Sequence, residues 1–245
     1  MYDSENSYDY LGVLLESRRS LVQKTCLAFK FPPKGVVILF DDSNYEYLPK
    51  TSLWRNLGNH LSIESGDGRQ SESPPIIEKI IRSKNYSHLI WLARRAWDTA
   101  EIDFLWNLAH ELRHLEQDIE KHAIALAGNF LYFNLSGMDI DERKILTTVP
   151  TEMDAELAAW RTARKLFGKQ LADSYVRDNA NVGEKQDIFR DLLKHDPDKK
   201  YNVFSETISL LRKYQRQFEA IITQSPSYYR KLGSVDELCR KLSDS

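Results

Sequence analysis

A five-residue segment near the middle of the chain, His110-Glu111-Leu112-Arg113-His114, has the residue types and the spacing of a metal site. On a helix, residues i and i+4 share one face, so both imidazoles can reach a single ion. The glutamate between them can reach a water held by that ion, which allows metal-assisted hydrolysis of a peptide bond. We therefore predict Zn²⁺ as cofactor, His110 and His114 as its ligands, and Glu111 as the general base.

A catalytic zinc needs a third protein ligand, and the segment 150–160 offers one. From Glu152 to Ala163, two carboxylates and three alanines form one helical stripe with spacings of one, three and four: Glu152, Ala155, Glu156, Ala159 and Ala163. Such a face can approach another helix closely, with its carboxylates in the contact. We predict Glu152 as the third ligand and Glu156 as the acceptor of a hydrogen bond from a ligand histidine. The alternatives for the third ligand are Glu156 itself and the cluster Asp139, Asp141 and Glu142.

Composition and charge bound the class of protein. The 245 residues carry 34 Lys and Arg against 36 Asp and Glu, a balance that argues against nucleic acid as a partner. The two cysteines, Cys26 and Cys239, are too few for a disulfide framework or a sulfur-built zinc site. The polar N-terminus has no signal-peptide pattern, and no apolar stretch is long enough to span a bilayer. We expect a cytoplasmic protein with no membrane partner.

The elements that position these residues follow from hydrophobic periodicity. Residues 35–40 and 88–94 are short apolar runs that predict buried strands. From Asp98 to Ile119, apolar residues at spacings of three and four predict a long helix that carries the His-Glu-x-x-His segment. Further helices are predicted at 11–28, 123–133, 151–167, 169–178, 184–194, 203–223 and 235–243, with a surface loop at 62–75.

This order of elements predicts an α+β, helix-rich fold. A small N-terminal sheet would precede the histidine helix, the glutamate helix and a C-terminal helical extension. We expect a single domain over residues 1–245, with three sub-parts. These are an N-terminal mixed α/β part (1–87), a metal-binding core (88–168) and a helical extension (169–245).

At the histidine and glutamate segments, residues 88–167 resemble the gluzincin metallopeptidases. Those proteins carry His-Glu-x-x-His on one helix and a ligand glutamate on a later helix, with an acidic residue four positions on. Glu152 and Glu156 match that pair by position. The chain is also similar to the ImmA/IrrE-like short cytoplasmic peptidases, which usually have Gly at the position of Arg113 and often Asn at that of Glu156.

The resemblance implies a zincin-like core and a peptide or protein substrate. It also implies an antiparallel edge strand that binds the substrate by strand addition, for which Leu89, Trp91 and Ala93 are the candidates; the alternative is an ordinary core strand. A further implication is a donor to the transition state, with Tyr175, Arg177, His195 and Tyr201 as candidates.

The leading functional hypothesis is thus a zinc-dependent metallopeptidase, a hydrolase. A first alternative is a regulatory or protein-interaction protein that holds zinc without peptidase turnover. A second is a helical interaction module in which the two histidines are four residues apart by chance. If His110, His114 and Glu152 converge on one point, the protein can hold zinc, as the leading hypothesis and the first alternative require. If they lie far apart, the helical interaction module is favoured. The sequence leaves the substrate and the oligomeric state open.

Overall fold

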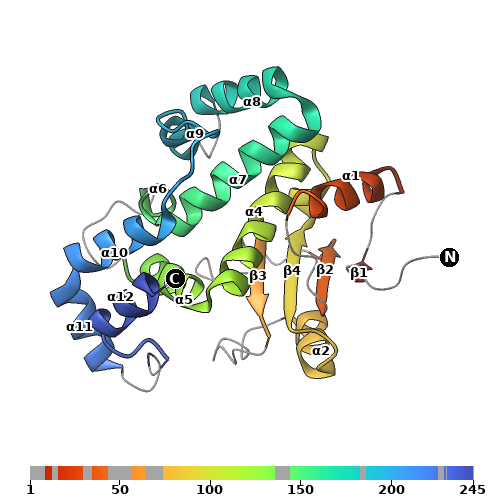
Figure 1. The fold of residues 1–245 in the computed structure, drawn as a ribbon. Helices are drawn as coiled ribbons and strands as arrows, with labels where there is room; N and C mark the ends of the chain where they lie inside the picture. Colours follow the sequence, from red (N-terminus) through yellow and green to blue (C-terminus); the bar gives the residue numbers. More distant parts are fainter. Residues whose placement is uncertain are drawn as a thin grey trace. The chain divides into compact units, whose positions relative to one another are not determined.

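The computed structural model describes residues 9–12, 16–29, 35–43, 57–63, 74–135, 144–182, 186–225, 229 and 231–244. Helices predominate in this part of the chain and are combined with one four-stranded sheet, which confirms the α+β, helix-rich class (Figure 1). The predicted ligand alternatives Asp139, Asp141 and Glu142 lie outside the described residues.

The chain divides into two compact units. Unit 1 comprises Met1–Glu116 and Thr162–Lys169, and unit 2 comprises Gln117–Arg161 and Gln170–Ser245. The boundaries cross two helices, α4 (Glu101–Glu120) and α7 (Pro150–Phe167), so each of these unbroken helices contributes residues to both units. The predicted sub-parts divide the chain at other positions.

Unit 1 contains the sheet, whose strands are ordered β1-β2-β4-β3. They are β1 (Asp9–Gly12), β2 (Val36–Asp41), β3 (Gly58–Ser62) and β4 (His88–Ala93). The strands β1, β2 and β4 are parallel, and β3 runs antiparallel to β4. The two central strands are apolar and almost wholly buried, as expected for strands covered on both faces.

Side chains of the central strands alternate between two apolar clusters, because successive residues of a strand point to opposite faces. Leu89 and Trp91 pack with Ile77 and Ile80 of α2 (Pro75–Ser83). Ile90 and Leu92 pack on the other face with α1 (Glu16–Cys26), α3 (Arg94–Trp97) and α4. The α4 residues in this second cluster are Phe104, Leu108, Leu112 and Leu115. The apolar stripe of α4 therefore lies against the sheet, as its spacing predicted.

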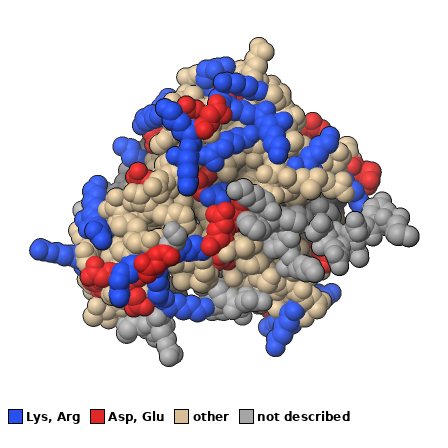
Figure 2. All heavy atoms as spheres, viewed as in Figure 1, with Lys and Arg blue, Asp and Glu red and all other residues tan. Residues whose placement is uncertain are grey.

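Unit 2 is helical, and its core forms around α5 (His122–Leu135), α10 (Val203–Lys213) and α12 (Val235–Ser243). Its other helices are α6 (Ile145–Thr148), α8 (Lys169–Asn181), α9 (Gln186–Leu192) and α11 (Gln215–Gln224). Over α10–α12, acidic and basic side chains lie beside one another (Figure 2), as in the Lys241–Glu237 ion pair of 2.9 Å. Within the described part of the chain, no helix has the length and apolar character that crossing a membrane requires.

Several predicted elements differ from the structure. Residues 9–12 form β1, so the first helix begins at Glu16 and not at Leu11. The strand β3 was not predicted at all. The predicted helix 203–223 is two helices, α10 and α11, separated at Tyr214. In contrast, β2, β4, α7 and α12 begin and end within about one residue of their predicted limits, which is the usual uncertainty of such boundaries.

Candidate metal centre

The two histidines of the His-Glu-x-x-His segment face each other on α4. Their Nε2 atoms are 3.0 Å apart and their rings meet edge to face, with centroids 4.7 Å apart. One turn of helix brings residues i and i+4 to the same face, which explains the contact. In a tetrahedral zinc site with Zn–N bonds of about 2.05 Å, two ligand nitrogens are about 3.3 Å apart. His110 and His114 therefore hold their nitrogens close to the separation that a shared zinc requires.

Glu152 completes a group of three ligand-type side chains. Ligand atoms of His110, His114 and Glu152 all lie within 4.8 Å of one another, and all three residues are half-buried. The three predicted ligands therefore form a group that could hold a metal ion. The donor set of two nitrogens and one carboxylate oxygen fits a catalytic zinc, which keeps a fourth position open.

Gln117 fixes the beginning of α7 against the end of α4. Its Nε2 atom donates to the carbonyl oxygen of Thr151 and to Oδ2 of Asp154, each at 3.0 Å. These two acceptors flank Glu152, and Gln117 lies three residues after His114 on the same helix. The Gln117 side chain therefore holds the backbone and a side chain on either side of Glu152, the predicted third ligand. Nothing in the sequence distinguished Gln117 from other polar residues of α4, so its role was not predicted.

The alanine-lined face of α7 is buried, as its composition predicted. Ala155, Ala159 and Ala163 have no exposed surface, and Glu156 is 4% exposed. A role for Glu156 in holding a ligand histidine stays a prediction. Arg113 of α4 pairs with Glu116 at 2.8 Å.

Glu111 lies beside the backbone of the strand β3. It is buried, and a Cβ atom placed on Gly58 would be 2.8 Å from Oε1 of Glu111 and 2.9 Å from Cδ2 of Leu92. Only a residue without a side chain leaves the carboxylate its present position. Glu111, the predicted general base, is thus held against the sheet, directly next to β3.

The predicted substrate strand is corrected by the sheet topology. β4, with Leu89, Trp91 and Ala93, is paired with β2 on one side and β3 on the other, so it is a core strand and not an edge strand. The reason is that its apolar run suits the sheet centre, whereas the more polar β3 occupies the edge among the described strands. The antiparallel strand next to α4 is therefore β3.

The backbone groups of β3 that point away from β4 follow from the register. Leu57 accepts a hydrogen bond from the Ala93 N–H, and the Ile63 N–H donates to Ser87. In an antiparallel pair, hydrogen-bonded residues alternate with residues whose backbone groups point outward. The N–H and C=O groups of Gly58, His60 and Ser62 are therefore directed to the other side of β3.

The candidate transition-state donors all lie in unit 2, and Tyr201 is close enough to Asp154 of α7 for that carboxylate to affect its pKa. Burial raises the pKa of the Tyr201 phenol, and the carboxylates of Glu206 and Asp154 raise it further. Asp154 is two residues from Glu152 on α7. Of the remaining candidates, Tyr175 packs on Phe189, and His195 packs edge-on against Tyr201 itself.

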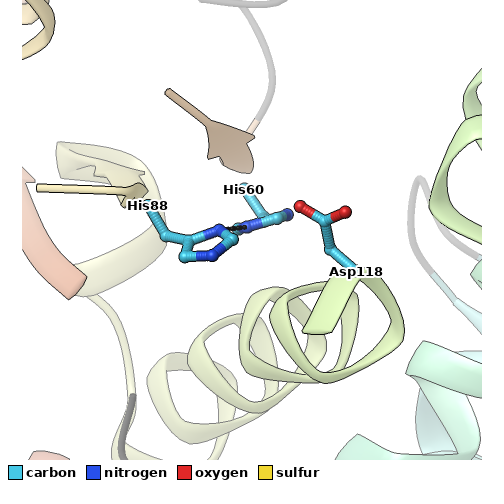
Figure 3. A group of neighbouring side chains, drawn as sticks. All are labelled: His60, His88 and Asp118. Atoms are coloured by element: carbon cyan, nitrogen blue, oxygen red, sulfur yellow. Dashed lines mark hydrogen bonds between the residues drawn. The ribbon is translucent and has the colours of Figure 1, made fainter. Parts of the chain in front are cut away.

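A second group of ligand-type side chains, His60, His88 and Asp118, was not predicted. Their ligand atoms also lie within 4.8 Å of one another (Figure 3). Burial lowers the pKa of His60 well below the ordinary value, and the charges of His88 and His114 lower it further. His60 lies on β3, a strand without a sequence signal, so its proximity to His88 could not be anticipated. His122, in turn, places its Nδ1 2.6 Å from Oδ1 of Asp118.

Comparison of the chain with protein-family models, with curated proteins and with solved structures gave no match. The resemblance to gluzincins inferred from the sequence therefore stays a prediction. What the residues of α4 and α7 described above share with a catalytic zinc site is their donor set, the spacing of their nitrogens, and a glutamate held beside them.

Proposed function

We propose that this protein is a zinc-dependent metallopeptidase with His110, His114 and Glu152 as ligands. The observation that carries the proposal is the grouping of these three ligand atoms within 4.8 Å, with Glu111 of α4 beside Gly58 of β3, an edge strand among the described strands. Zinc, when bound, supplies a Lewis acid that acidifies water and polarises a carbonyl oxygen. Every other task in the reaction falls to side chains and backbone groups of this chain.

Glu111 is proposed as the group that takes a proton from the attacking water and passes it to the leaving amine. A carboxylate in this role must be held in a fixed position near the reacting atoms. Gly58 and Leu92 restrict where the Glu111 side chain can lie. This restriction supports Glu111 as the base and makes its position sensitive to any side chain added at residue 58.

The peptide substrate is proposed to lie along β3. Gly58, His60 and Ser62 direct their backbone N–H and C=O groups away from β4, and a peptide in extended conformation can pair with such groups by strand addition. A peptide bound in this way next to Gly58 would pass close to Glu111. Tyr201 is proposed as the donor that stabilises negative charge on the substrate carbonyl, because the charge of Asp154, two residues after Glu152 on α7, raises its pKa.

We propose a cytoplasmic location. Both cysteines are buried thiols, as expected for a protein of a reducing compartment. The alternative function is a regulatory or protein-interaction protein that holds zinc without turnover. This alternative has the same metal ligands as the peptidase. The two differ only in whether Glu111 acts as a general base in peptide hydrolysis.

The decisive experiment compares cleavage of a proteome-derived peptide library by zinc-loaded wild type, Glu111→Gln and the control Glu101→Gln. Glu101 is an exposed residue at the beginning of α4, so the control makes the same change away from the metal centre. We expect Glu111→Gln to lower kcat by about 10²–10⁴-fold with unchanged zinc content, and Glu101→Gln to behave as wild type. Zinc-loaded wild type that cleaves no peptide would overturn the peptidase proposal in favour of the alternative.

Gly58→Ala is a second variant that probes the position of Glu111. The three atoms nearest to the added methyl group belong to the side chains of Glu111 and Leu92, so the fold is expected to tolerate it while the carboxylate moves. A displacement of about 1 Å at a reacting group can cost about 100-fold in rate. We expect kcat to fall by about 10- to 100-fold with zinc content and thermal stability unchanged. An unchanged kcat would show that Glu111 is not positioned by β3.

A further inference from the structure

We propose that His60, His88 and Asp118 form a second metal site, which binds a divalent cation of the zinc class. The three residues come from β3, β4 and α4, and their ligand atoms lie within 4.8 Å of one another (Figure 3). This site is separate from the group of His110, His114 and Glu152 and shares no residue with it. The proposal goes beyond the peptidase function and does not depend on it.

The sheet register brings the two histidines together. His60 is paired with Ile90 and Ser62 with His88, so His60 and His88 are diagonal neighbours across β3 and β4. Diagonal neighbours on one face are about 7–8 Å apart at the backbone, within reach of two imidazole side chains. The rings are stacked with centroids 5.3 Å apart, and Nε2 of His60 is 3.1 Å from Nδ1 of His88.

That nitrogen separation is almost the same as the 3.0 Å found between His110 and His114. Two ligands of one tetrahedral zinc are about 3.3 Å apart, so each pair needs a shift of only a few tenths of an ångström to share an ion. Two neutral imidazoles can also form a hydrogen bond with each other, in which one ring N–H donates to the bare nitrogen of the other ring. A bare hydrogen-bonded pair is therefore the competing explanation that an experiment must test.

The sheet face on which the histidines lie is the face against α4. His88 shares its side of β4 with Ile90 and Leu92, because alternate residues of a strand point the same way. Ile90 and Leu92 pack with Leu112 and Leu115 of α4. Gly58 of β3 lies against Glu111 of α4, and His60 follows two residues later on β3. His60 is also close enough to His114, in the next turn of α4, for the charge of His114 to affect it.

Asp118 supplies the carboxylate of the second site. It lies one turn after His114 on the same unbroken helix, so helix geometry fixes its place beyond the first histidine pair. Its side chain is 4% exposed, and Figure 3 shows the carboxylate turned toward the ring of His60. His122 Nδ1, 2.6 Å from Oδ1, orients the carboxylate in the way that outer partners orient metal ligands.

Two nitrogens and one carboxylate oxygen form the same donor set as the first group, which is why we assign the same class of cation. The residues His110, His114 and Asp118 follow one another at intervals of four, so α4 would contribute to both sites from one row of side chains. The row advances about 6 Å from His114 to Asp118, which places the second ion about one helical turn from the first.

The test measures zinc bound per chain by equilibrium dialysis after chelator treatment. Wild type is compared with Asp118→Asn, with the matched control Asp187→Asn on α9, and with His110→Ala. Asp187 is half-exposed, pairs with Arg190 and belongs to neither ligand group. We expect about two ions for wild type and Asp187→Asn, and about one for Asp118→Asn. His110→Ala, which disrupts the first group, is expected to retain about one ion at His60, His88 and Asp118.

A second measurement uses the wild-type chain, so that no variant needs to fold. Histidine ring resonances are followed by NMR during titration with Zn²⁺, with His195 as internal control. We expect the ring signals of His60 and His88 to shift with one of the two equivalents. The proposal is overturned if these signals stay in place, or if Asp118→Asn binds as much zinc as Asp187→Asn. In that case the three side chains form a hydrogen-bonded cluster without metal, whether or not the protein is a peptidase.

Discussion

The two histidine pairs of this protein have almost the same nitrogen separation, 3.0 Å and 3.1 Å, but different structural origins. His110 and His114 are four residues apart on α4, so the hydrogen bonds of one helix set their spacing. His60 and His88 are 28 residues apart and meet only because β3 pairs with β4 in one register. The first pair is therefore a property of a helix, and the second is a property of the assembled sheet.

The largest expected effect comes from Leu112→Ala, which removes a buried side chain between His110 and His114. Leu112 is 1% exposed and packs on the sheet face that carries His88, Ile90 and Leu92. We expect the free energy of unfolding to fall by about 2–5 kcal/mol in urea titrations. The helical pair should keep its spacing, whereas the strand pair loses part of the packing that holds it against α4.

The control for this change is Leu171→Ala on α8, where the side chain is 52% exposed. A surface substitution of this kind is expected to change the free energy of unfolding by less than about 0.5 kcal/mol. Equal losses for both variants would contradict the placement of Leu112 between the helix and the sheet.

A smaller effect is expected from Gln117→Leu, which removes the two hydrogen bonds to α7 and keeps the volume. The first turn of α7 around Glu152 then loses two of the hydrogen bonds that hold it, so zinc affinity at the first group should fall by about 10- to 100-fold. Competition with a chromophoric chelator measures this affinity. The change should leave the ring resonances of His60 and His88 in place, and Gln224→Leu, at an exposed end of α11, should bind zinc as wild type does.

The smallest effect is expected from pH. Burial and the neighbouring His88 and His114 hold the pKa of His60 well below its ordinary value of 6.5 in the folded chain. Below about pH 6.5 the unfolded chain therefore binds a proton at this residue that the folded chain does not. The free energy of unfolding of the metal-free protein should decrease as the pH falls from 6.5 toward the folded pKa, and should be insensitive to this group at higher pH.

Urea titrations of metal-free wild type and His60→Gln at several pH values isolate this contribution. The difference in stability between the two chains should become less favourable to wild type as the pH falls. A difference that is constant over this range would mean that His60 has the same pKa in the folded and unfolded chain.

Much of the fold could be predicted because its signals are local. The apolar stripe of α4 and the Glu/Ala face of α7 repeat at helical spacing, and β2 and β4 are continuous apolar runs. β3 could not be predicted because Gly58–Ser62 is polar and only half-buried, so it pairs with β4 without an alternating pattern. The break between α10 and α11 falls at Tyr214, with no Gly or Pro to mark it.

In the candidate site too, the residues with a local sequence signal were predicted and those that depend on distant partners were not. The segment His110–His114 and the face of Glu152 were found from spacing within one helix. Gln117, Gly58 and His60 were missed because their roles depend on partners far away in the sequence: Thr151, Glu111 and His88. The sequence also could not predict which strand lies at the edge of the sheet, because strand order depends on pairing between distant segments.

The absent side chain at Gly58 has a consequence for how sequence changes at this position would be tolerated. A Cβ atom there meets the movable ends of Glu111 and Leu92 and not rigid backbone, so the chain can still fold around it. In a library of all substitutions at residue 58, selection for abundance and selection for hydrolysis should therefore give different answers. Small residues such as alanine would pass the first selection and fail the second, which would mark residue 58 as a position constrained by activity.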